Sequence, residues 1–446
     1  MGRILNSETS KIAILACFIA TASAAQDTET NGVSLTVSQN LNYDLDGDES
    51  NSFRALTGLQ LNYGTATRAN GFQFTASTGL EFGGEDSING FLDPIVSVSY
   101  RQESKNAGIT ASANLRQAEV SSILGVENLV DPGFVTIDSG RQTDVNYSVG
   151  YDFGRTDPIS GSITYSNNAR RYAETDDATL LDFENHAVTG QVNLRFDDRI
   201  VGRVSASFTE YSEDGGLSRT SAGYGIGANL AVNQTLSVDA SLNFDETERT
   251  DSGITTTTDG LGFTLAANQS LPDGSLSARL SSFVNENGRS TTVNVSRAME
   301  LRNGSLSFSL GGVRDEDGEF DPTYSIGYEQ ELPRGALVSI EASQTFNTSI
   351  DGVDSINTSA AATFSTPLTT VSSFQATANY RETNGLDLSE VDASRLDLGL
   401  TYQHDLAQDW GLVGGYNRSF TTEDGEADQT SDTVFVGLQK NFEWRP

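Results

Sequence analysis

Apolar and polar residues alternate along most of the chain with a period of two. Between Val145 and Phe153, one set of alternate positions carries Val, Tyr, Val, Tyr and Phe, while the other carries Asn, Ser, Gly and Asp. The same alternation recurs in residues 188–196, 236–244, 374–380 and 396–402. It indicates β-strands that have one apolar face and one polar face. No long stretch has the spacing of an amphipathic helix.

Marked in this way, the chain contains about 22 strands of roughly ten residues each, the length that a tilted strand needs to cross a membrane. We place them at 33–45, 53–64, 71–82, 94–101, 107–120, 143–154, 160–170, 187–197, 200–211, 219–232, 235–246, 258–270, 275–286, 289–297, 305–314, 323–330, 336–347, 357–364, 371–381, 394–404, 411–420 and 433–442.

The connections between these strands fall into two alternating classes. One class is short and turn-like, at 197–199, 233–234, 271–274, 301–304, 332–335 and 406–409. The other is longer and acidic, at 46–52, 83–93, 121–142, 171–186, 212–218, 247–257, 315–322, 382–393 and 421–432. Short periplasmic turns opposite long outer loops are typical of outer-membrane barrels.

The fold expected is therefore all-β: a closed transmembrane antiparallel β-barrel of about 22 strands, within a range of roughly 16 to 24. Two other β folds fit less well. A stack of soluble sandwiches would show domain boundaries, and no linker of distinct composition divides this chain. A β-solenoid would repeat at a fixed length, and these loops vary widely.

The N-terminus has the features of an export signal. Arg3 and Lys11 flank a short polar start, residues 12–20 are apolar, and Ala22-Ser23-Ala24 supplies the small residues of a cleavage site. We expect residues 1–25 to be a signal peptide and residues 26–446 to form one barrel domain. Cys17 offers a lipoprotein alternative, although Leu15 is unusual for that motif and the apolar stretch continues beyond Cys17.

The C-terminal segment carries a resemblance to a known class. Val434, Val436, Leu438 and Phe442 alternate, interrupted by Lys440. This resembles the last strand of Gram-negative outer-membrane proteins, whose closing aromatic residue is recognised by the barrel-assembly machinery. The chain is thus similar in architecture to porin-like outer-membrane β-barrels, although residues 443–446 follow the aromatic. The resemblance implies a location in the outer membrane, with lipid and lipopolysaccharide as surroundings.

Composition excludes several functions. The chain has 27 Lys+Arg against 61 Asp+Glu, a formal charge of −34, and its few lysines are Lys11, Lys105 and Lys440. Nucleic-acid binding requires clustered Lys and Arg at the phosphates, so we expect none. One Cys and two His leave no Cys/His nucleophile pair and few ligands for zinc, haem or iron–sulfur clusters, so no cofactor is expected.

The polar faces of the strands define the predicted lumen. Their charged residues are nearly balanced, which suits the passage of polar solutes, and each Arg could form a lumen ion pair or contact a solute. The predicted pore-lining residues are Arg101, Arg116, Arg195, Arg203, Arg279, Arg381 and Arg395, together with Asp144, Asp152, Asp197, Asp239, Glu329, Glu341 and Asp397.

Barrels of about 22 strands usually hold a plug. Only a short stretch separates the predicted cleavage site from the first strand, so we expect no N-terminal plug, which argues against TonB-dependent receptors and Omp85 proteins. Loop 121–142 is unusually apolar and could fold onto the barrel wall. It resembles the third loop of general porins, which implies that Glu127, Asp131 and Asp138 form the acidic side of a constriction. A hairpin outside the membrane is an equal alternative.

Catalytic and metal sites have little support. His186 is placed in an outer loop and His404 near a periplasmic turn, so the two cannot share a site, and we expect no enzyme. Asp44, Asp46 and Asp48 have hard oxygen ligands near Ca²⁺ spacing, but they lack the downstream Glu of an EF-hand, and solvated loop tips explain them as well.

The sequence thus predicts a passive, porin-like outer-membrane channel for small polar solutes. Two alternatives remain. One is a structural or adhesion barrel whose lumen is closed and whose acidic loops bind a surface partner. The other is an exopolysaccharide exporter, in which the lumen arginines would form a track for an anionic polymer.

Overall fold

A computed structural model of the protein describes residues 32–45, 52–82, 91–120, 140–175, 180–285, 288–315, 318–348, 354–385, 392–423 and 428–444. The predicted signal peptide, 1–25, lies outside this part of the chain, as do Asp46, Asp48 and the predicted constriction residues Glu127, Asp131 and Asp138.

The described chain forms one sheet of 22 strands, as the alternation predicts. The strands are β1 (Gly32–Asp44), β2 (Ser52–Ala66), β3 (Asn70–Phe82), β4 (Phe91–Glu103), β5 (Ala107–Glu119), β6 (Arg141–Phe153), β7 (Ile159–Ala173), β8 (Phe183–Arg195), β9 (Ile200–Glu213), β10 (Ser218–Ala231), β11 (Leu236–Asp251), β12 (Ile254–Leu271), β13 (Gly274–Asn285), β14 (Gly288–Leu301), β15 (Gly304–Arg314), β16 (Phe320–Leu332), β17 (Ala336–Thr348), β18 (Asp354–Thr369), β19 (Ser372–Gly385), β20 (Ala393–Ala407), β21 (Trp410–Glu423) and β22 (Gln429–Trp444). A short 3-10 turn, η4 (Pro333–Gly335), joins β16 to β17.

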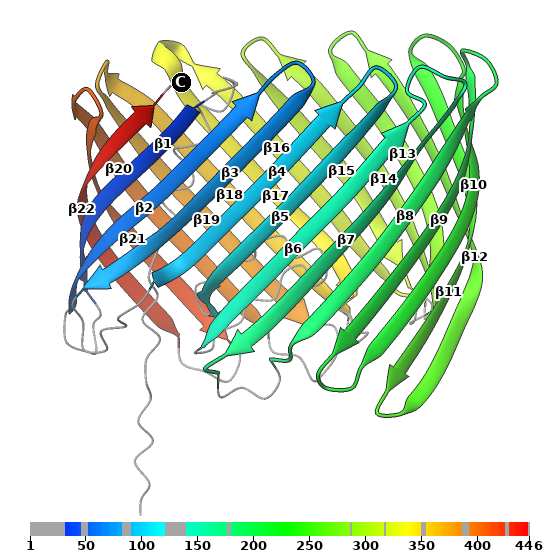
Figure 1. The fold of residues 1–446 in the computed structure, drawn as a ribbon, viewed down its shortest axis with the longest axis horizontal. Helices are drawn as coiled ribbons and strands as arrows, with labels where there is room; N and C mark the ends of the chain where they lie inside the picture. Colours follow the sequence, from blue (N-terminus) through cyan, green and yellow to red (C-terminus); the bar gives the residue numbers. More distant parts are fainter. Residues whose placement is uncertain are drawn as a thin grey trace, which may run out of the picture.

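The sheet closes on itself. Every strand pairs antiparallel with its sequence neighbours, and β1 also pairs with β22, from Val33 opposite Trp444 to Asp44 opposite Thr433. Figure 1 shows the tilted strands wrapped into a barrel, with the end of β22 beside the start of β1. Closure leaves no strand edge with unpaired backbone groups, which is the condition for β-structure in a membrane.

The two rims of the barrel differ. At one rim the described connections are tight, such as 67–69, 272–273, 302–303 and η4; we call this the short-turn rim. Most connections at the other rim are longer and include the residues that the structure does not describe. The predicted outer loop at 247–257 is wrong: β11 and β12 continue to a two-residue turn at Ser252 and Gly253, where both residues have positive φ, as a tight hairpin turn requires.

The apolar face of the sheet is the outer one. The described residues contain only ten buried hydrophobic side chains, and the one cluster among them is small, formed by Phe183, Tyr211 and Leu217. In contrast, Ile226, Leu242 and Leu310 are each more than half exposed. A lumen enclosed by 22 strands is too wide for side chains to fill, so apolar residues facing inward would meet water. Facing outward, they meet lipid, and the alternate polar residues line the lumen.

Candidate functional site

The polar lumen wall is the candidate site, and the register shows where the predicted lining residues lie. All but one of the fourteen fall on the lumen face of a strand. The exception is Asp197, which lies in the turn after β8. Its Oδ1 accepts hydrogen bonds from the backbone N–H groups of Arg199 and Ile200, both at 2.7 Å. This carboxylate therefore shapes a turn at the short-turn rim.

One ion pair spans an intervening strand. Arg203 on β9 donates from Nη2 to Oδ1 of Asp239 on β11 at 3.1 Å, across β10. Gly227 of β10 lies beneath the guanidinium, and a Cβ at this position would meet Arg203 Nη2 at 3.1 Å and the backbone oxygen of Ala240 at 2.9 Å. Glycine at this position therefore leaves room for the arginine to reach its partner.

A second group lies toward the rim with the longer connections. Arg170 Nε donates to Asp144 Oδ1 at 2.8 Å, and the two side chains are 11% and 16% exposed. Gln142 donates to the other carboxylate oxygen of Asp144 at 2.7 Å, and the guanidinium lies 5.5 Å from the centre of the Phe183 ring. Arg170 is not among the predicted lining residues, although its position on the polar face of 160–170 was a usable signal.

A third group combines two arginines and one carboxylate. Arg381 on β19 stands directly opposite Arg395 on β20. Arg395 is buried and donates from Nε to Asp397 Oδ1 at 3.0 Å. Two arginines opposite each other on neighbouring strands repel, and the negative charge of Asp397 offsets part of that repulsion.

Charge is also paired at both rims. At the short-turn rim, Asp152 of β6 accepts hydrogen bonds from Arg155 in the following turn, and these bonds raise the pKa of the Arg155 guanidinium. Arg101 lies 3.9 Å from Glu103, a weak exposed pair. At the opposite rim, Arg54 Nη2 lies 2.7 Å from Asp44 Oδ2.

The predicted calcium ligand Asp44 thus already has protein partners. Besides Arg54, its Oδ1 accepts a hydrogen bond from Thr433 Oγ1 at 2.8 Å. Within the described residues, no group of three or more His, Cys, Asp or Glu side chains is arranged to hold a metal ion.

The placement of His186 in an outer loop is wrong. The residue belongs to β8, where Nδ1 lies 3.0 Å from the Tyr165 hydroxyl and Nε2 lies 3.4 Å from Glu184 Oε1. His404 belongs to β20, where its ring stacks on Tyr402. The two histidines are on strands that do not pair with each other.

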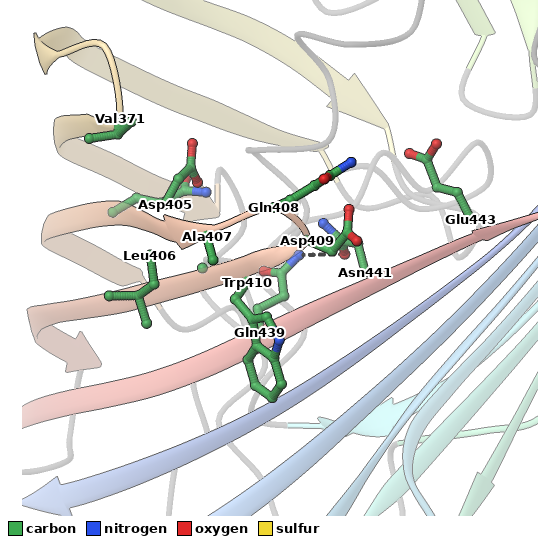
Figure 2. A pocket seen from close by; sticks show the side chains of 12 residues that line it. Val371, Asp405, Leu406, Ala407, Gln408, Asp409, Trp410, Gln439, Asn441 and Glu443 are labelled. Carbon is green, nitrogen blue, oxygen red and sulfur yellow. Dashed lines mark hydrogen bonds between the residues drawn. The ribbon is translucent and has the colours of Figure 1, made fainter.

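A hollow of about 550 Å³ lies at the short-turn rim, where β20, β21 and β22 meet (Figure 2). Its lining includes three carboxylates, from Asp405, Asp409 and Glu443, and no Lys or Arg. Side-chain amides from Gln403, Gln408, Gln439 and Asn441 complete the polar surface.

The structure contains no helix, in its described part, that is long and apolar enough to cross a membrane.

No protein-family model matches the sequence, and no curated protein matches it significantly. Solved structures share its fold. The FrpB iron transporter from Neisseria meningitidis (F5-1 variant) has a TM-score of 0.60 and 9% identity, covering 93% of this chain and 83% of that one. The siderophore receptor PirA from Pseudomonas aeruginosa has a TM-score of 0.52 and 11% identity, covering 93% and 81%. The ferric enterobactin receptor PfeA from the same species, solved as a Q482A mutant with enterobactin, has a TM-score of 0.56 and 10% identity, covering 93% and 82%.

The fold is that of an outer-membrane barrel. The 22 paired strands, their closure and the apolar outer face are those of a membrane-spanning barrel, and the protein belongs in the outer membrane. The barrel is thus similar to those of siderophore receptors, the kind of protein that the expected lack of a plug argued against. The residues before β1, on which that expectation depends, lie outside the described part of the chain.

Proposed function

We propose that this protein is a passive, porin-like channel for small polar solutes in the outer membrane of a Gram-negative bacterium. The observation that carries the proposal is the lumen face itself. Its alternate positions are mostly polar, and several of its charged residues pair with one another. Such a lining keeps a path of water through the barrel.

Conductance in planar lipid bilayers tests this proposal. Purified, folded protein should give stepwise current increases, and heat-unfolded protein should give none. A matched pair of variants ties the current to the lumen: Ser241→Cys faces the lumen, and Leu242→Cys faces lipid. The only native Cys is Cys17. A bulky thiol reagent should reduce the current of the Ser241 variant and leave that of the Leu242 variant unchanged.

Absence of current from protein that is demonstrably folded would overturn the channel. It would favour an uptake receptor, to which the likeness with FrpB and PirA lends support, or a structural barrel with a closed lumen.

We also propose two partners outside the lumen. Outer-membrane lipid and lipopolysaccharide would surround the apolar outer face. The barrel-assembly machinery would engage β22, whose Phe442 and Trp444 rings stack on one face of the last strand with centroids 6.0 Å apart. Phe442→Ala should lower the yield of assembled barrel in cells without weakening the purified barrel. An unchanged yield would contradict this partner.

A further inference from the structure

The charges in the lumen divide into two arcs near the short-turn rim. On β4 to β13, the half of the lumen face next to this rim carries mixed charges: Arg101, Arg195, Arg203 and Arg279 together with Glu103, Asp152 and Asp239. On β14 to β22, the corresponding half carries only acidic charges, from Glu300, Glu329, Glu331, Glu341, Asp405 and Glu443. We call the second set the acidic arc.

The two arcs are not equally neutralised. In the mixed half on β4 to β13, Arg203 is paired with Asp239, Asp152 is paired with Arg155, and Arg101 lies near Glu103. In the acidic arc, the carboxylates of Glu300, Glu329, Glu331, Glu341 and Asp405 form no ion pair with any described residue. The negative charge of the acidic arc therefore acts on the lumen, while part of the positive charge opposite is cancelled.

The cations closest to the acidic arc along the chain do not lie on the lumen wall. Arg302 and Arg334 occupy the turns that follow β14 and β16, where both are exposed to solvent. Lys440 of β22 faces outward, with its ammonium group 4.6 Å from the centre of the Trp410 ring and 5.2 Å from that of Phe442. Within the described part of β14 to β22, this half of the lumen wall has no basic residue.

The hollow at the short-turn rim belongs to the same arc. Asp405 and Glu443 contribute to both, and Asp409 adds a carboxylate from the turn between β20 and β21 (Figure 2). Carboxylates of one sign along a water-filled wall raise the local concentration of cations. The field extends about 8–10 Å from the wall at ordinary ionic strength.

We propose that the acidic arc makes this channel prefer cationic solutes over anionic ones. This inference rests on the proposed channel function and names the class of solute that the channel favours. The preference is distributed over the wall of the lumen and does not require a single binding site. It should weaken as salt rises, because the screening length falls from about 10 Å at 0.1 M to about 3 Å at 1 M.

The reversal potential across a bilayer with a tenfold KCl gradient measures this preference. The native protein should favour K⁺ over Cl⁻ by about twofold or more. The lumen variant Glu329→Gln/Glu331→Gln/Glu341→Gln should move the reversal potential toward zero. A control with the same change in charge, Glu210→Gln/Glu246→Gln/Glu248→Gln, alters residues of the outer face and should keep the native potential.

The outcomes separate the two proposals. No current from folded protein would overturn the channel itself. Native current with a zero or anion-selective reversal potential would overturn only the cation preference, as would a lumen variant that keeps the native potential. A difference in migration between the unheated and the heated protein in detergent gels shows that each variant is folded.

Discussion

Val33, the second residue of β1, stands directly opposite Trp444, the last residue of β22. The pairing that begins there continues for the whole length of β1, to Asp44 opposite Thr433. The first and last strands of the described chain are thus joined by a full ladder of backbone pairs, and closure of the barrel requires both strands. Phe442, at which the sequence pattern placed the end of the last strand, lies opposite Leu35, inside this ladder.

Removing the charge of Arg170 should destabilise the barrel. Arg170→Met leaves Asp144, which is 16% exposed, with only the hydrogen bond from Gln142. Removing one partner of a buried ion pair lowers the free energy of unfolding by about 3–5 kcal/mol. Because Arg170 and Asp144 are both partly exposed, we expect a loss near the lower end of this range. Equilibrium urea unfolding in lipid vesicles measures the loss.

The adjacent residue supplies the control for that variant. Arg171 faces outward, is 49% exposed, and lies 3.7 Å from both Asp182 and Glu184. Arg171→Met should change the free energy of unfolding by no more than about 1 kcal/mol. Equal effects at the two positions would mean that the pair with Asp144 contributes nothing specific.

Adjacent residues on β12 should differ sharply in their tolerance of charge. Leu265 is 49% exposed on the outer face, and Thr264 lies on the lumen face. Leu265→Arg puts a guanidinium into the hydrocarbon, which costs about 2–4 kcal/mol near the bilayer midplane. Thr264→Arg should cost far less, because the lumen is wet. Urea unfolding in lipid vesicles measures the free energy of unfolding of both variants. If the Thr264 variant loses more stability than the Leu265 variant, the outer and lumen faces are assigned wrongly.

Two turn glycines should differ in the cost of an added methyl group. Gly154 has φ +70°, and a Cβ there would collide with the backbone of Ile159 and Ser160. Gly253 has φ +80°, but a Cβ there would meet no atom within 4 Å. Gly253→Ala should therefore cost only the positive-φ penalty, about 1–2 kcal/mol. Gly154→Ala should cost more, as measured by the urea midpoint; equal costs would contradict the collision.

The pair between Arg297 and Asp273 should make stability depend on pH. The guanidinium donates to Asp273 Oδ1 at 2.6 Å, and this hydrogen bond lowers the pKa of the Asp273 carboxyl. A carboxyl whose pKa is lower in the folded state stabilises the fold above its unfolded pKa. That contribution is lost as the pH falls through the lower, folded pKa, so the relevant window lies below about pH 4.

Thermal unfolding of Asp273→Asn tests this linkage. The variant should unfold at a lower temperature than the native protein at pH 6, and the difference should shrink at pH 3. Asp198→Asn, in another turn at the same rim, is the control and should leave the unfolding temperature at pH 6 unchanged. A difference that persists unchanged at pH 3 would contradict the linkage.

Strand number and closure could be predicted from the sequence because a lipid-facing strand must alternate. The alternation fails where strands rise beyond the hydrocarbon, since both faces then meet water. On β11, Phe244 is the last apolar residue of the outer face, and Glu246, Glu248 and Thr250 follow it in the same positions. This is why the predicted loop at 247–257 proved to be paired strand.

The lumen partners were harder to predict because they depend on register. Parity puts Arg203 and Asp239 on the same face, but only the stagger of β9, β10 and β11 shows that the two meet across Gly227. Likewise, Asp144 stands opposite Arg116 in the ladder, yet it pairs with Arg170 of the next strand. Sequence spacing alone does not distinguish these partners.

The ladder between β1 and β22 also limits how fast the barrel can form. Thr36 donates to Asn441 at 2.9 Å, although 405 positions separate the two residues along the chain. The length-dependent entropy of closing such a loop opposes this contact by about 5 kcal/mol. Closure must therefore be a late event, after the intermediate hairpins have shortened the effective loop. Until then the open edges of β1 and β22 can pair with other chains. The closing step is therefore the step of assembly at which protection from aggregation matters most.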